Sequence, residues 1–281
     1  MKRACFLGLV SMVAITCFSQ PAKTFTASFT SDDRIAMVKN SIDIPAWHEK
    51  SFWPVYENYI SKAEEVSLRA YRSLDDLVRM NKVVTDEEAH NHATKLLAYR
   101  HAELEVMKQY YSEIGVAMNG IVSFQFLQAE TLLDMMESAR IYDASIYRNY
   151  RFHPGVVDED EFTTAKYNTI SKAIDLPVDK AQDFYEIYTR YDHESDDLLG
   201  EEYSIYGYYA CEPSDFTPGI AKRLGHDLLN VMQREAKLKE KYFAEMNNVV
   251  GPVLAARFLA WEDYYSILNK MRAWSEGFSE Q

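Results

Sequence analysis

The chain repeats itself after 132 residues, and this repeat constrains its fold more than any other feature of the sequence. Residues 42–45 (Ile-Asp-Ile-Pro) correspond to residues 174–177 (Ile-Asp-Leu-Pro). Without any gap, 18 of the 104 pairs between residues 38–141 and 170–273 are identical, which is far more than chance gives. The period is too long for a solenoid unit of about 20–50 residues. We therefore expect two tandem copies, each a small domain of its own.

The spacing of apolar residues predicts helices in both copies. Glycine and proline are scarce, with 10 and 8 residues, and apolar side chains recur at steps of three and four. In the first copy, this pattern predicts a short helix at about 31–40 and longer helices at about 45–81, 86–118 and 121–140.

Helix-start signals support this interpretation. Thr85 and Glu88 have the spacing of a capping box, and Thr217 is followed by a proline at the first helical position. Antiparallel helices with short connections bury their apolar stripes on each other. The expected fold class is all-α, with two tandem copies of a long-helix hairpin and flanking short helices. Together the copies form a pseudo-dimer within one chain.

Four segments are expected along the chain. A linker is predicted where His153-Pro154-Gly155 is followed by an acidic run. The segments are a signal peptide at 1–19, helical repeat 1 at 20–141, the linker at 142–160 and helical repeat 2 at 161–281.

The N-terminus has the features of a secretory signal. Lys2 and Arg3 precede an apolar run, and small residues lie before the expected cleavage between Ser19 and Gln20. A lipoprotein attached through Cys17 is the alternative. The expected location is therefore periplasmic or secreted, with no membrane insertion after the signal is removed.

Charge and cysteine content narrow the partners. Without Lys2 and Arg3, the mature chain has 28 basic and 43 acidic residues, a net charge of −15. Such a charge argues against nucleic acid and anionic membranes as partners. Cys211 is the one cysteine left after cleavage, so no disulfide forms within the chain. We expect apolar burial alone to hold the core together.

A metal site is the first candidate that the histidines suggest. His90 and His92 are two residues apart, about 200° around a helix, so they face opposite ways. His101 shares a face with His90 but lies about 16 Å further along the axis. No histidine corresponds to another histidine under the repeat. We therefore expect no metal and no cofactor, and a metal-binding sensor that uses these histidines with nearby glutamates is the alternative.

Carboxylates recur at four pairs of equivalent positions: Asp43/Asp175, Glu103/Glu235, Glu113/Glu245 and Glu130/Glu262. The aspartates precede helix starts, where a side chain can cap free amides. The glutamates can pair with Arg or Lys between helices. Known catalytic motifs are missing from the sequence, so we do not expect an enzyme. An enzyme would require a closed pocket in which buried Glu103 or Glu235 has a shifted pKa.

Tyrosine is abundant, with 20 residues, and several recur in both copies. One interpretation is that these are helix-packing residues with their hydroxyls at the rim. The functional interpretation is an aromatic, amphipathic surface that holds extended or partly unfolded chains. The predicted binding residues are Tyr56, Tyr59 and Tyr71 with their equivalents Tyr188, Tyr191 and Tyr203.

Two local signatures carry a family resemblance. Residues 42–45 with 52–56 begin the first long helix of copy 1, and residues 120–130 and 251–262 begin the closing helix of each copy. Each copy resembles the Spy/CpxP family of periplasmic LTXXQ-motif proteins, which includes helical stress chaperones and metal-responsive sensors. Prolines hold the Thr place of the motif here. The resemblance implies a cradle dimer of long helices fused into one chain, although it is acidic where the well-known chaperone is basic.

Together these features lead to one main hypothesis. We expect an exported, non-enzymatic helical protein that binds protein or peptide clients, as a chaperone-like protein or an envelope-stress sensor. The metal-binding sensor and an enzyme of unknown reaction are the alternatives.

Overall fold

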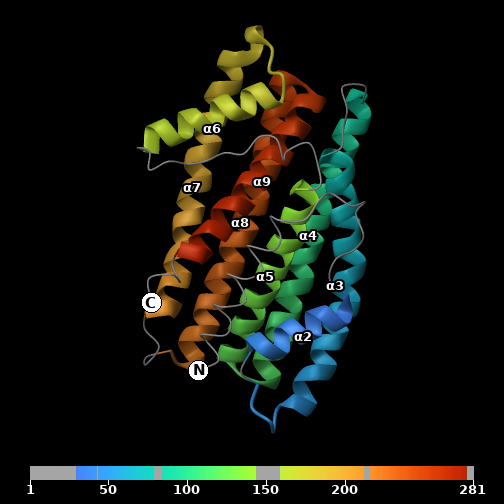
Figure 1. The fold of residues 1–281 in the computed structure, drawn as a ribbon, viewed down its shortest axis with the longest axis vertical. Coiled ribbons are helices and arrows are strands. Elements are labelled where there is room, and N and C mark those ends of the chain that lie inside the picture. The colour runs from blue at the N-terminus through green and yellow to red at the C-terminus, as the bar shows by residue number, and fades with distance from the viewer. Residues whose placement is uncertain (1–29, 43, 79–83, 144–158, 212–215, 277–281) are drawn as a thin grey trace.

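The computed structural model describes residues 30–42, 44–78, 84–143, 159–211 and 216–276, and every regular element in these ranges is helical (Figure 1). This confirms the predicted all-α fold. The elements are α2 (Ser31–Ser41), α3 (Glu49–Val78), α4 (Asp86–Ala117), α5 (Gly120–Asp143), α6 (Glu159–Ala173), the 3₁₀ helix η2 (Val178–Lys180), α7 (Ala181–Cys211), α8 (Pro218–Val250) and α9 (Pro252–Glu276). The predicted signal peptide, Asp43 and most of the predicted linker lie outside the described residues. Within the described ranges, the helices lack an apolar stretch that would cross a membrane.

The helix bounds follow the repeat. Moved by 132 residues, α4 would span 218–249 and α5 would span 252–275, and α8 and α9 occupy these ranges to within one residue. Likewise, α3 moved by the same distance coincides with α7 to within one residue. The two sequence copies therefore have the same order and length of long helices.

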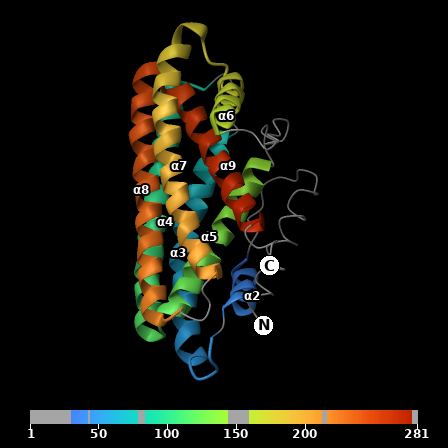
Figure 2. The ribbon, with the colours of Figure 1, turned by 90° about the vertical axis from the view of Figure 1, so that its left-hand side faces the viewer.

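The long helices form two layers. One layer contains α3, α4, α8 and α7 in this spatial order, with α4 against α8 where the copies meet (Figure 1). Helices α5 and α9 cover one face of that layer, and α5 contacts α8 while α9 contacts α4. Each closing helix thus packs on the hairpin of the other copy. Short helices α2 and α6 lie at opposite ends of the molecule on this same side (Figures 1 and 2).

The core is continuous across both copies. One cluster of buried apolar side chains includes residues from each long helix, so the expected separate cores are corrected to a single shared one. The physical reason is that α5 and α9 bury their apolar sides against both hairpins at once. The aromatic contacts still repeat: Tyr59 meets Phe126 edge-on with ring centroids 4.9 Å apart, and Tyr191 meets Phe258 at 5.3 Å.

Two of the predicted helix starts are confirmed. The Thr85 side chain accepts a hydrogen bond from the Glu88 amide at 3.2 Å, and Glu88 accepts one from the Thr85 amide at 3.0 Å. Thr217 caps α8 by accepting from the Ile220 amide at 3.3 Å, with Pro218 at the first helical position.

The backbone at Asp175 ends α6. Asp175 has a φ of 56°, which is the left-handed conformation. The Leu176 amide donates to the Ser171 carbonyl at 2.9 Å and the Asp175 amide to the Lys172 carbonyl at 3.3 Å. This is the Schellman arrangement, whose left-handed residue is usually Gly and can be Asp or Asn.

The contact between α4 and α8 requires a glycine. Tyr111 reaches from α4 across to α8, where its hydroxyl donates to the Lys222 carbonyl at 2.8 Å. A Cβ at Gly225 would overlap the Tyr111 ring. Gly200 on α7, in contrast, has open space where its Cβ would lie.

These two glycines give a matched test of the packing between the copies. Gly225→Ala should lower the free energy of unfolding by about 1–3 kcal/mol because the added methyl group displaces Tyr111. Gly200→Ala should raise it by about 0.5–1 kcal/mol because alanine favours the helix. Chemical denaturation measures both, and equal effects of the two substitutions would contradict this packing.

Candidate functional site

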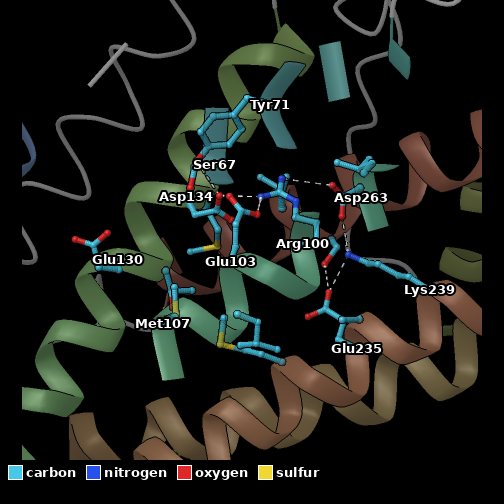
Figure 3. Close-up of a pocket in the computed structure, with 18 of the residues that line it drawn as sticks. Ser67, Tyr71, Arg100, Glu103, Met107, Glu130, Asp134, Glu235, Lys239 and Asp263 are labelled. Atoms are coloured by element: carbon cyan, nitrogen blue, oxygen red, sulfur yellow. Dashed lines mark hydrogen bonds and ion pairs between the residues drawn. The ribbon is translucent and has the colours of Figure 1, made fainter. Parts of the chain in front are cut away.

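A pocket of about 170 Å³ lies where the two copies meet, among α2, α3, α4, α5, α8 and α9 (Figure 3). Leucine and methionine side chains, including Leu104, Met107, Met135 and Met232, form its apolar wall. The charged side chains that line it are Arg34, Arg100, Glu103, Glu130, Asp134, Glu235, Lys239, Asp263 and Lys270. The lining is therefore partly apolar and densely charged.

On the copy 1 side, Arg100 organises the charges. Its guanidinium donates to Glu103 at 3.0 Å, to Asp134 at 2.9 Å and to the Ser138 hydroxyl at 2.8 Å. The Tyr71 hydroxyl also donates to Asp134, at 2.9 Å. Figure 3 shows Arg100 between these carboxylates and Asp263 of the other copy.

On the copy 2 side, Glu235 is held by three donors. The Lys239 and Lys270 ammonium groups lie 3.1 and 2.7 Å from its carboxylate, and the Ser266 hydroxyl donates at 3.1 Å. Lys239 also contacts Asp263 at 2.6 Å, and Lys270 contacts Glu202 at 3.0 Å. Pairing between helices, as predicted, is confirmed for Glu235 with Lys270, whereas Glu103 pairs with Arg100 of its own helix.

Asp263 joins the two sides. Its carboxylate lies 3.9 Å from the guanidinium of Arg100, which belongs to copy 1, and accepts a hydrogen bond at 3.1 Å from the hydroxyl of Tyr142 at the end of α5. Arg100, Asp263, Lys239 and Glu235 thus form one chain of ion pairs across the seam between the copies.

The two equivalent glutamates differ in pKa. Burial raises the pKa of Glu103, and the nearby Arg100 offsets this only in part. Burial acts in the same direction on Glu235, but Lys239 and Lys270 outweigh it and hold the pKa of Glu235 well below its usual range. The difference follows from the number of cations around each carboxylate.

Each copy also has an ion pair at equivalent positions that is separate from this row of four charged residues. Arg34 of α2 contacts Glu130 at 2.9 Å, and the equivalent Lys166 of α6 contacts Glu262 at the same distance. Lys166 also contacts Asp192, at 2.7 Å. The short helices are thus fastened to α5 and α9 by buried charges.

The predicted binding tyrosines lie in the interior. Five of the six are buried, and Tyr203 is half-buried with its hydroxyl donating to the Asn269 carbonyl at 3.1 Å; the five are Tyr56, Tyr59, Tyr71, Tyr188 and Tyr191. The expected exposed aromatic surface is therefore corrected, because these rings pack between the helix layers. Tyr59 and Tyr71 nevertheless line the pocket.

The histidines of α4 point to different partners. His90 stacks on Phe243 with ring centroids 5.8 Å apart, whereas the imidazole of His92 lies 3.6 Å from Asp76 and that of His101 lies 3.4 Å from Glu240. Among the described residues, no three His, Cys, Asp or Glu side chains are placed to hold a metal ion.

The sequence interpretation missed the basic members of the site. Arg100 with Glu103 and Lys239 with Glu235 have the three- and four-residue spacing of helical ion pairs, which is a usable signal. Arg34 and Lys166 also occupy equivalent positions of the repeat, just outside the aligned region.

Comparison of the chain with protein-family models, curated proteins and solved structures gave no match. The resemblance to the Spy/CpxP family therefore stays a prediction from the residues quoted above.

The two equivalent ion pairs Arg34–Glu130 and Lys166–Glu262, called here the outer ion pairs, allow a matched prediction. Glu130→Gln should lower the free energy of unfolding by about 3 kcal/mol, because it leaves the Arg34 charge, on a side chain that is only 15 % exposed, without its partner. Glu262→Gln should cost about 1 kcal/mol or less, because Lys166 keeps Asp192. Chemical denaturation at pH 7 measures both changes. Equal losses of unfolding free energy in the two variants would contradict the idea that Asp192 compensates in copy 2 only.

A pH dependence follows from Glu202. Burial raises its pKa, and Lys270 offsets this only in part. The stability contributed by the protonated form is complete below the unfolded pKa of about 4.3 and is lost as the pH rises through the raised folded pKa. The wild type should therefore lose stability relative to Glu202→Gln as the pH rises from about 4.5 to about 8. Parallel stability curves for the two proteins over this range would refute the shift.

Proposed function

We propose that this chain is a non-enzymatic binding protein that holds a small ligand in the pocket between its two copies. The observation that carries the proposal is the pocket itself, which combines about 170 Å³ of space with an apolar wall and charged side chains from both copies. Pockets of mixed apolar and convergent polar lining are where small molecules bind. A cavity of about 150 Å³ holds a benzene molecule, so a ligand of about six to eight non-hydrogen atoms fits.

The shape of the pocket supports a single ligand rather than two. The pocket extends into copy 1, past Ser67 and Tyr71. At equivalent positions, copy 2 has Leu199 where copy 1 has Ser67, and Lys270 where copy 1 has Ser138. The remaining space beside Leu199 in copy 2 measures about 20 Å³, enough for about one water molecule. Leu199 thus takes up in copy 2 the space that stays open beside Ser67 in copy 1.

An enzyme is the second candidate, and one observation favours it. The pocket contains both Glu103, whose pKa is raised, and Glu235, whose pKa is lowered, and such divergent pairs are typical of a catalytic acid and base. Glu235, however, already accepts hydrogen bonds from Lys270 and Ser266 and lies against Lys239, which makes it a weak base. Binding is therefore the better supported function. Turnover of a hydrolysable glycoside or ester that is lost on Glu103→Gln would favour the enzyme instead.

Protein or peptide clients remain a prediction. The predicted tyrosines are mostly buried, so a client would reach them only if α5 and α9 separated from the four-helix layer. Export to the periplasm and a stress-sensing role remain predictions as well.

Filling the pocket tests the proposal. A panel of small molecules of up to about eight non-hydrogen atoms, at about 1 mM each, should contain members that raise the Tm of the wild type, because a ligand of the native state stabilises it. Ala236→Leu, which places a larger side chain in the pocket lining, should abolish these shifts. Ala98→Leu on the exposed side of α4 is the matched control and should keep them. Shifts that persist in Ala236→Leu, or no shift with any compound, would overturn the proposal.

A further inference from the structure

The two repeated glutamates differ in how many basic groups surround them. Glu235 is contacted by Lys239, one helical turn later on α8, and by Lys270 of α9. Glu103 is contacted by Arg100. Among the described residues, Arg100 is the one basic side chain within ion-pair distance of Glu103. The position equivalent to Lys239 in copy 1 is Met107. Glu103 therefore has one cation fewer than Glu235.

The place of the missing cation is inside the pocket. Glu103 and Met107 are one turn apart on α4, and both line the 170 Å³ space (Figure 3). In copy 2, the corresponding turn of α8 carries the Lys239 ammonium, which lies between Glu235 and Asp263. Copy 2 thus has a lysine ammonium group beside its glutamate, and copy 1 has none at the equivalent position.

Acidic side chains outnumber basic ones around the whole pocket. Four basic and five acidic side chains line it, and Glu202, which contacts Lys270 from behind, adds a sixth carboxylate. The basic groups are already paired with carboxylates, so an anionic ligand would find no unpaired cation among the described residues of the lining. Buried charge without compensation is costly. A positively charged ligand therefore gains the most from this site.

We infer that the ligand of this pocket is a small primary alkylammonium ion. Its charged end lies against Glu103, in the place that the Lys239 ammonium takes beside Glu235, and its alkyl part lies against Met107 and Leu104. This inference rests on the proposed binding function and names the chemical class of the ligand. The lysine side chain without its backbone is n-butylammonium, which makes that ion the natural probe.

The experiment compares n-butylammonium with n-butanol and butyrate, which have the same chain but are neutral and anionic. Isothermal titration of the full-length protein should show that the ammonium ion binds at least about tenfold more tightly than either analogue. Glu103→Gln should weaken the binding of n-butylammonium by about tenfold or more, because the ion then faces a neutral amide.

A tethered competitor gives the sharper test. Met107→Lys places in copy 1 the lysine that copy 2 already has, so it should abolish n-butylammonium binding, whereas Ala98→Lys on the exposed side of α4 should keep it. Equal binding of n-butanol and n-butylammonium, or unchanged binding in Met107→Lys, would overturn the inference. If n-butylammonium fails these tests but other small molecules bind the wild type and not Ala236→Leu, the pocket is a binding site for ligands that are not ammonium ions. The proposed binding function then holds without this inference. If no compound binds the wild type, the proposed function fails as well.

Discussion

Burial of carboxylates at the seam between the copies is the constraint on which the rest of this structure depends. Glu103, Asp263 and Glu235 lie where helices of both copies meet, and a charge removed from water is tolerated only when it is paired. Arg100 and Lys239 provide that pairing, and Asp263 links copy 1 to copy 2. Because each partner comes from a fixed turn of a helix, the ion pairs fix how far α4 and α9 can slide past each other.

The repeat explains why the pocket lies where it does and why it is lopsided. The positions that repeat identically, such as Tyr59 with Tyr191 and Glu130 with Glu262, form the common framework of aromatic packing and outer ion pairs. The positions that differ, such as Met107 against Lys239, decide whether the space beside the central glutamate is filled. Divergence within a duplicated framework thus leaves space beside Glu103 where Lys239 fills the equivalent place beside Glu235.

Much of the fold could be predicted from the sequence because helices have a period that local residues reveal. The capping box at Thr85 and the start of α8 at Thr217 involve contacts within four residues, and both were predictable. The shared core was not, because the pairing of α5 with α8 and of α9 with α4 depends on packing between distant segments. Asp175 shows a local limit: a residue before one helix can equally end the helix before it.

The site was harder to predict than the fold. Glu103 and Glu235 were named as candidates, but their opposite pKa shifts depend on Lys270, which lies 35 positions from Glu235 in the sequence. The tyrosines were named for an exposed surface, whereas the structure buries most of them. An amphipathic helix stripe shows that a residue faces something apolar, and it does not show whether that is a client or a neighbouring helix.

A crystal structure of the protein soaked with n-butylammonium tests the central claim most directly. We expect elongated density in the pocket, with the nitrogen at about 2.7–2.9 Å from the Glu103 carboxylate, the usual length of a charge-assisted hydrogen bond. A pocket that contains only ordered water at saturating amine would contradict it.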